Sequence, residues 1–179
     1  MKKWLVASSL MLALSSALAA GDNAAYFNGP DGRYKYPTVA DIKPLSDFKS
    51  VQAFEKNYQQ VIQKCLDHTM GGSGGIPCNI ASDIWNRELN TAYSELMKAL
   101  SDETAKHALR EAQRNWIKQR DLDQKWLLAL TNYRYRNHQQ GSMYQLMSSG
   151  DLDTDTAALV KNRTLLLRQW LKQLHTSVD

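Results

Sequence analysis

The chain has only two cysteines, and both could take part in a disulfide or at a metal site. Cys65 and Cys78 enclose a segment with four glycines, which is flexible enough to bring the two sulfurs together. A metal site built on Cys65-x-x-His68 and Cys78 lacks a convincing fourth ligand, because the other three histidines are scattered singly. The spacing therefore favours a disulfide, and the absence of a C-x-x-C pair argues against redox catalysis.

A second group of chemically distinctive residues lies in the stretch 109–121, which reads L-R-E-A-Q-R-N-W-I-K-Q-R-D. Trp116 is on the apolar side of this helical pattern, so it is either a core anchor or a contact in an interface. Arg114 and Asp121 are seven residues apart and share a face, whereas Arg120 is offset from Asp121 by about 100°. We therefore expect no direct pairing of Arg120 with Asp121. Instead these charges should hold neighbouring helices through charge-assisted hydrogen bonds.

Sequence signatures of catalysis are missing from the chain. Serines and histidines occur without nucleophile-elbow spacing, and there is no helical H-E-x-x-H. The run Gly71-Gly72-Ser73-Gly74-Gly75 lacks the spacing and the following lysine of a phosphate-binding loop. These residues predict a binding protein rather than an enzyme, with no cofactor and no metal.

The N-terminal segment has the pattern of a secretory signal peptide. Lys2 and Lys3 precede an apolar stretch, and Ala17-Leu18-Ala19 supplies the small residues that a signal peptidase reads. A membrane-spanning helix would need about 20 apolar residues, whereas serines interrupt a shorter run here. We expect residues 1–19 to be removed, with cleavage after Ala20 as the alternative, and a periplasmic or secreted protein without stable membrane insertion.

The net charge gives no reason to expect nucleic-acid binding. Removal of residues 1–19 would take away two lysines and no acidic residue, which lowers the formal charge from +4 to +2. Nucleic-acid-binding domains usually carry a clustered basic face, and no such cluster stands out in this chain.

The elements that must position these residues are helical. Residues 20–46 contain three of the four prolines and predict an irregular, aromatic-containing arm that lies partly over the body or binds a partner. Residues 47–179 show three- and four-residue apolar spacing, with helices expected from about residue 46 to the glycine segment and over 80–100, 103–137 and 154–173. Tyr133 and Leu166 are expected on inward stripes, and residues 141–150 form a polar connection. The fold class is all-α, an antiparallel bundle of about four helices with one disulfide.

The pattern Leu89-Asn90-x-x-Tyr93-x-x-Leu96-x-x-x-Leu100, followed by Leu109-x-x-Ala112-Gln113-Arg114-x-Trp116-x-x-x-Arg120-Asp121, resembles the LprI-like family. The resemblance covers about residues 60–175 and implies an exported helical inhibitor of lysozyme. Family members often carry a cysteine where this chain has Gln124, so this chain lacks that additional bridge. Asn90 and Tyr93 are expected to hydrogen-bond across helices. The motif residues expected to form scaffold are Asn90, Tyr93, Gln113, Arg114, Trp116, Arg120 and Asp121.

An inhibitor of this kind should contact its partner through connections presented by rigid helices. The two connections that qualify are the glycine segment 70–77 and residues 141–153. The candidate contact residues in the second connection are Met143, Tyr144, Met147, Asp151 and Asp153. The partner would be lysozyme or another cell-wall hydrolase. Two alternatives remain: an immunity protein that neutralises a toxin acting in the periplasm, and an envelope housekeeping or small-ligand-binding protein.

Overall fold

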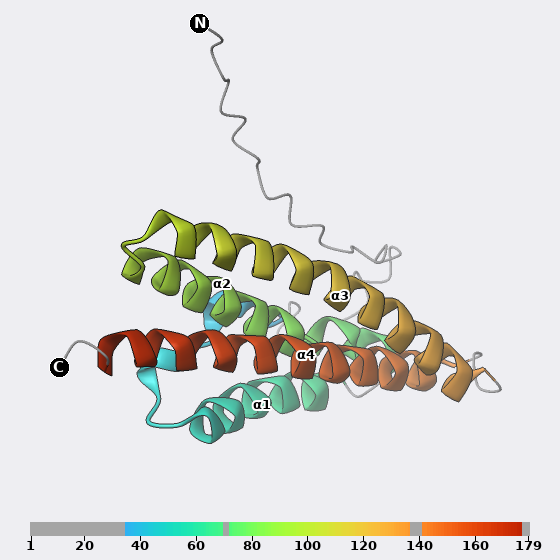
Figure 1. Cartoon of the computed structure of the whole chain (residues 1–179). Helices are drawn as coiled ribbons and strands as arrows, with labels where there is room; N and C mark the ends of the chain where they lie inside the picture. The colour runs from blue at the N-terminus through green and yellow to red at the C-terminus, as the bar shows by residue number, and fades with distance from the viewer. Residues whose placement is uncertain (1–34, 70–71, 137–140, 177–179) are drawn as a thin grey trace, which may run out of the picture.

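A computed structural model describes residues 35–69, 72–136 and 141–176, and this part of the chain is helical without a strand (Figure 1). The α-helices are α1 (Val51–His68), α2 (Ala81–Ala99), α3 (Glu103–Tyr135) and α4 (Ser142–Thr176). Three short 3-10 helices precede or join them: η2 (Val39–Asp41), η3 (Leu45–Asp47) and η4 (Gly72–Cys78). The all-α bundle predicted from the sequence is confirmed.

The helices pack around α2 and α4. A short turn after α2 sends α3 back antiparallel to it, and α4 returns along both helices (Figure 1). On the side of α4 opposite α3, α1 closes the bundle (Figure 1). No helix in the described ranges combines the length and apolar character that a membrane span requires.

Helix starts are stabilised by side chains that accept hydrogen bonds from backbone N–H groups. Ser50 caps α1 through the N–H of Ala53, and Asp102 caps α3 through the N–H of Ala105. Because Ile80 precedes α2 and has no polar side chain, Asp153 of α4 caps that helix instead. Its two carboxylate oxygens accept from the N–H groups at the first two positions of α2, each at 2.9 Å. This contact also places a negative charge at the positive end of the α2 dipole.

The core contains an aromatic cluster between α1 and α2. The rings of Phe54 and Trp85 meet edge to face with centroids 5.4 Å apart, and both side chains are fully buried. The indole Nε1 of Trp85 donates a hydrogen bond of 3.1 Å to the hydroxyl of Tyr58. Burial raises the pKa of Tyr58 above its usual range. The cluster therefore satisfies its polar atoms internally while it joins the two helices.

The second half of the N-terminal arm packs against the helical body, as expected. Ile42 and Leu45 are buried in the core, and the hydroxyl of Tyr36 donates to the carbonyl oxygen of Gly74 at 3.0 Å. The other aromatic residues of the arm and the expected signal peptide, residues 1–34, lie outside the described residues.

The prediction of a polar connection over residues 141–150 and a last helix starting near residue 154 was wrong. A single helix, α4, begins at Ser142 and includes Gly150. The segment has no proline, and Leu146 packs closely over Gly75 of η4, so tertiary contact outweighs the low helix propensity of one glycine.

The expected inward stripes were also partly wrong. Leu166 is 36% exposed and Tyr133 is 63% exposed. In α4 the buried face carries polar side chains among the apolar ones: Thr156, Ala157, Val160, Arg163, Thr164 and Leu167. A search for apolar periodicity therefore selects the wrong face of this helix.

Candidate functional site

The predicted disulfide is confirmed. Cys65 at the end of α1 and Cys78 at the end of η4 are bonded, with Cα atoms 5.7 Å apart, and both are fully buried. The bond holds the end of α1 beside the start of α2. In the described ranges no group of three or more His, Cys, Asp or Glu side chains is arranged to hold a metal ion.

The glycine segment is a packed element rather than an open connection, which corrects the expectation for its described part. Residues Gly72–Cys78 form η4, in which Gly74 and Gly75 are buried. A Cβ atom at Gly75 would lie 3.0–3.1 Å from methyl groups of Leu146 and Leu66. The absence of a side chain there allows α4 and α1 to approach the segment closely.

Two residues of the family-like motif, Gln113 and Trp116, contact Arg163 of α4. Gln113 is buried, and its Oε1 accepts a hydrogen bond of 3.0 Å from Nε of Arg163. The guanidinium carbon of Arg163 is 5.9 Å from the ring centroid of Trp116 and 5.3 Å from that of Trp170. These contacts join α3 to α4.

The sequence analysis did not identify Arg163 as a buried residue, because an arginine is rarely assigned to a core position. Its side chain is 9% exposed, and one terminal nitrogen has no hydrogen-bond partner in the described structure. Desolvation lowers the pKa of this guanidinium below its usual value. The available signal was its spacing from Val160 and Leu167, which puts all three on one face of α4.

The expected geometry of the arginines and aspartate in this motif was wrong. Arg120 pairs directly with Asp121, through hydrogen bonds of 3.1 and 2.7 Å to one carboxylate oxygen. The long arginine side chain curls along the helix surface, so the 100° offset between neighbouring positions does not prevent contact. Arg114 is exposed and pairs within α3 with Glu111 at 2.6 Å. Among the described residues, neither arginine forms an ion pair with another helix.

The predicted cross-helix hydrogen bond of Asn90 and Tyr93 is also absent from the described structure. Asn90 is exposed on α2, and Tyr93 is half-buried with its ring packed against the core. Asn90 therefore belongs to the solvated face of this helix.

The two acidic candidates for partner contact hold the bundle together. Asp151 accepts a hydrogen bond of 2.9 Å from the hydroxyl of Tyr135 and forms an ion pair of 3.1 Å with Arg134. The bond to Asp151 raises the pKa of the Tyr135 hydroxyl. Asp153 caps α2, as described above. Both carboxylates are thus engaged in contacts between α4 and its neighbours.

The three apolar candidates, in contrast, are exposed at the start of α4. Met143 is 52% exposed, Met147 is 46% exposed and Tyr144 is 37% exposed. They belong to a larger set, because seven of the eight exposed large hydrophobic residues in the described structure fall between residues 122 and 147. The remaining members on α3 are Leu122, Trp126, Leu128 and Tyr133. We call the described residues 122–136 and 141–147 the hairpin end.

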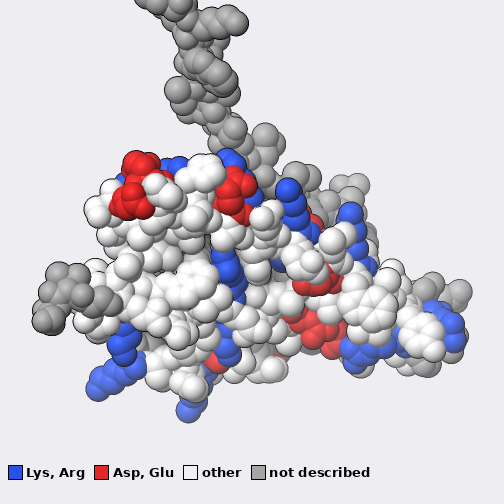
Figure 2. Space-filling view, viewed as in Figure 1, with Lys and Arg blue, Asp and Glu red and all other residues white. Residues whose placement is uncertain are grey.

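Exposed apolar surface concentrated in this way is typical of interaction sites. Figure 2 shows uncharged surface beside lysine and arginine atoms at this end of the molecule. Two shallow hollows lie elsewhere, one of about 260 Å³ beside Tyr36 and one of about 360 Å³ between the ends of α2, α3 and α4. Sequence reasoning named the methionines and Tyr144 as candidates but did not name the exposed Trp126 and Tyr133, because helix periodicity alone does not reveal which helix faces are covered.

Comparison with known proteins gives one match. A family model described as lysozyme inhibitor LprI matches residues 75–162, a segment that includes α2, α3 and the first half of α4. No curated protein and no solved structure matches the chain. The motif on α2 and α3 that suggested the resemblance lies inside the matched segment. The resemblance to the LprI-like family is therefore confirmed, because the family model described as lysozyme inhibitor LprI matches residues 75–162.

Proposed function

We propose that this protein is an exported protein-binding module that inhibits lysozyme or another cell-wall hydrolase. The observation that carries the proposal is the match of residues 75–162 to a family described as lysozyme inhibitors. That segment contains all seven motif residues and the whole hairpin end. An inhibitor needs a rigid surface and no chemistry of its own, in keeping with a non-enzymatic role.

The described contacts support separate roles for the buried motif residues and the exposed residues of the hairpin end. Gln113 and Trp116 are used in helix packing, whereas Trp126 and Tyr133 are each 63% exposed. Tryptophan, tyrosine and arginine are the side chains that most often dominate binding energy in protein interfaces. A preorganised helical surface also loses little conformational entropy on binding.

Export is part of the proposal. It is supported by the signal-like pattern of residues 1–19 and by the buried Cys65–Cys78 bond, because structural disulfides form in oxidising compartments such as the periplasm. Lysozyme reaches its cell-wall substrate in the same compartment, so an inhibitor would have to act there.

The direct test is inhibition by purified protein. Residues 20–179 are produced with the disulfide formed, and the clearing of a cell-wall suspension by an animal lysozyme and by a phage-type lysozyme is followed. We expect a dose-dependent decrease in the rate with at least one enzyme. If neither enzyme is slowed at high micromolar protein, lysozyme inhibition is refuted for this chain.

A further inference from the structure

In the hairpin end, α3 extends beyond the start of α2, while η4 packs against the start of α4 at Ser142 and Leu146. At a rise of about 1.5 Å per residue, α3 with 33 residues is roughly 50 Å long, whereas α2 with 19 residues is roughly 28 Å long. Because α3 runs antiparallel to α2 from a shared turn, it passes the first residue of α2 near Leu122. Figure 1 shows the C-terminal part of α3 and the start of α4 extending together at this end. The exposed hydrophobic residues of α3 begin at the same point.

Three of these residues form a stripe on the outer side of α3. Trp126 and Tyr133 follow Leu122 by four and eleven residues, so helix geometry puts them within about 40° of it. Thr131, which is buried, is half a turn away from Leu122 and faces the bundle. The stripe thus points away from α4, with Leu122 57% exposed and both aromatic residues 63% exposed.

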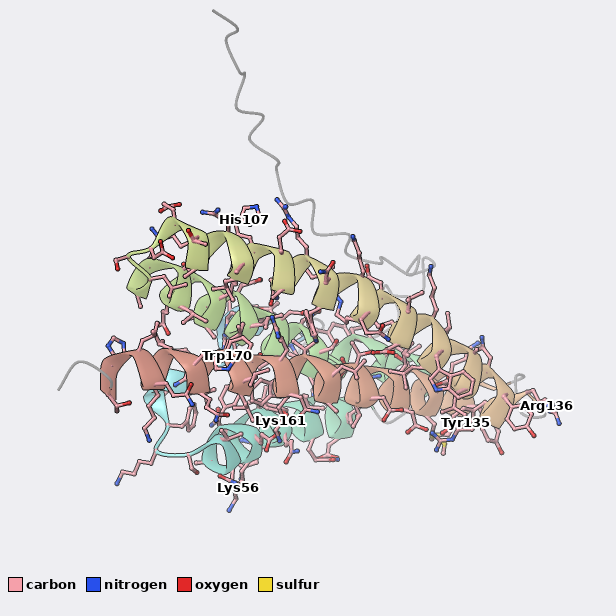
Figure 3. All side chains as sticks on the ribbon, in the orientation of Figure 1. Lys56, His107, Tyr135, Arg136, Lys161 and Trp170 are labelled. Atoms are coloured by element: carbon pink, nitrogen blue, oxygen red, sulfur yellow. A yellow bond between two sulfur atoms is a disulfide. The ribbon has the colours of Figure 1, made fainter. Side chains whose placement is uncertain are left out.

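The hairpin end is also cationic. Its described residues include the basic Lys125, Arg134 and Arg136 and the acidic Asp123. Arg134 pairs with Asp151 of α4, so Lys125 and Arg136 supply the positive charge that Asp151 does not compensate. The guanidinium carbon of Arg136 lies 4.5 Å from the ring centroid of Tyr133, and no ion pair joins Arg136 to a carboxylate in the described structure. Figure 3 shows Arg136 at the extreme end of the hairpin, directed away from the helical body. This combination fits a partner surface that is concave, apolar in part and acidic.

We infer that the hairpin end enters the substrate cleft of a glycan-cleaving hydrolase, with Arg136 directed at its catalytic carboxylates and the stripe of Leu122, Trp126 and Tyr133 against its sugar-binding walls. This inference rests on the proposed function and names its contact surface. Glycoside hydrolases cleave with a pair of Asp or Glu residues in the cleft, and a cleft lined by one sign of charge concentrates the field. The flat rings of Trp126 and Tyr133 could pack on the same cleft walls that bind the apolar faces of sugar rings in the substrate.

Charge complementarity favours this occupant over a second copy of the chain. Two hairpin ends placed against each other would bring like charges together, which disfavours a symmetric pair. An anionic lipid surface would also attract basic and aromatic side chains. Binding to such a lipid surface would be detected in the test as binding to vesicles.

The test uses matched variants of the disulfide-bonded protein against a lysozyme that the unaltered protein inhibits. Arg136→Gln is compared with Arg114→Gln, an exposed arginine outside the hairpin end, and Leu122→Ala with Leu166→Ala. We expect the inhibition constant to rise at least tenfold for Arg136→Gln and several-fold for Leu122→Ala, and to stay within twofold for both controls. Soluble tri-N-acetylchitotriose, which fills the cleft, should compete with the protein.

Each other outcome has a distinct meaning. If the unaltered protein inhibits but Arg136→Gln and Leu122→Ala inhibit equally well, or if the oligosaccharide does not compete, the hairpin end is not the cleft-binding surface and the inference is overturned. If those substitutions abolish only binding to phosphatidylglycerol vesicles, or only self-association in sedimentation, the surface serves a membrane or a second copy instead. If the unaltered protein inhibits no lysozyme, the proposed function itself is refuted.

Discussion

Replacement of Arg87 should destabilise the protein more than replacement of any other partly exposed residue of α2. Its guanidinium has five N–H groups and donates five hydrogen bonds. Two go to one carboxylate oxygen of Glu88, at 2.9 and 2.7 Å. The other three go to backbone carbonyl oxygens of Val39, Ile42 and Lys43, at 2.7, 2.7 and 3.1 Å. Arg87 therefore both neutralises a buried acid and fastens the N-terminal arm to α2.

The expected loss follows from the burial of the two partners. Glu88 is 2% exposed and the Arg87 side chain is 27% exposed. Removing one partner of a buried ion pair costs about 3–5 kcal/mol, because the other charge stays buried without compensation. Since Arg87 is partly exposed, we expect Arg87→Ala to lower the free energy of unfolding by about 3 kcal/mol, at the lower end of that range. For a chain of this size that corresponds to a decrease in Tm of roughly 6–12 °C.

Two further variants separate charge from geometry. Arg87→Lys keeps the charge but lacks the planar fork, so it should still lose about 1–2 kcal/mol. In the double variant Arg87→Ala with Glu88→Leu no carboxylate is left unpaired, so it should be more stable than Arg87→Ala alone by at least about 1 kcal/mol. Urea unfolding, followed by circular dichroism, gives the free energy of unfolding of the unaltered protein and the three variants. Limited proteolysis reports release of the N-terminal arm.

The reasoning would be refuted by either of two results. One is a loss below about 1 kcal/mol for Arg87→Ala, the range of an ordinary surface ion pair. The other is a double variant less stable than Arg87→Ala, which would mean that Glu88 needs no partner. Unchanged proteolysis of residues 35–48 in Arg87→Ala would show that the arm is held by packing of its apolar residues alone.

Further predictions concern the covalent bond, the motif and the N-terminus. Replacing Cys65 and Cys78 together by alanine should cost about 3 kcal/mol, the chain-entropy value for the loop closed by their 13-residue separation, and reduction of the unaltered protein should give the same unfolding curve. Trp116→Ala should lower the free energy of unfolding by about 2–4 kcal/mol, because it empties part of the α3–α4 contact. Arg114→Ala should change it by less than about 0.5 kcal/mol, because that side chain is 68% exposed, and equal losses in thermal melts would contradict the assignment. Periplasmic extracts should yield a mature protein that begins after Ala19 or one residue later; mass spectrometry that finds an intact N-terminus in a membrane fraction would exclude cleavage.

Local patterns in the sequence were sufficient for the fold class, the approximate helices before residue 136 and the disulfide. Three- and four-residue spacing on α1, such as Phe54, Tyr58 and Cys65, reports a helix face that is buried whatever it packs against. The glycine segment similarly indicated that the two cysteines could meet. The family resemblance also came from the sequence, through side chains at fixed spacing on α2 and α3.

Tertiary structure decided what local patterns do not contain. Whether Gly150 lies within a helix depends on the packing of α4 over η4, and whether Arg163 is buried depends on Gln113 and Trp116 of α3. Asp151 and Asp153 were candidates for partner contact until their bonds to α3 and α2 were known. Trp126 and Tyr133 are exposed because they lie on the outer face of α3, opposite the face that carries the buried Gln113 and Thr131, and only the packing shows which face is covered.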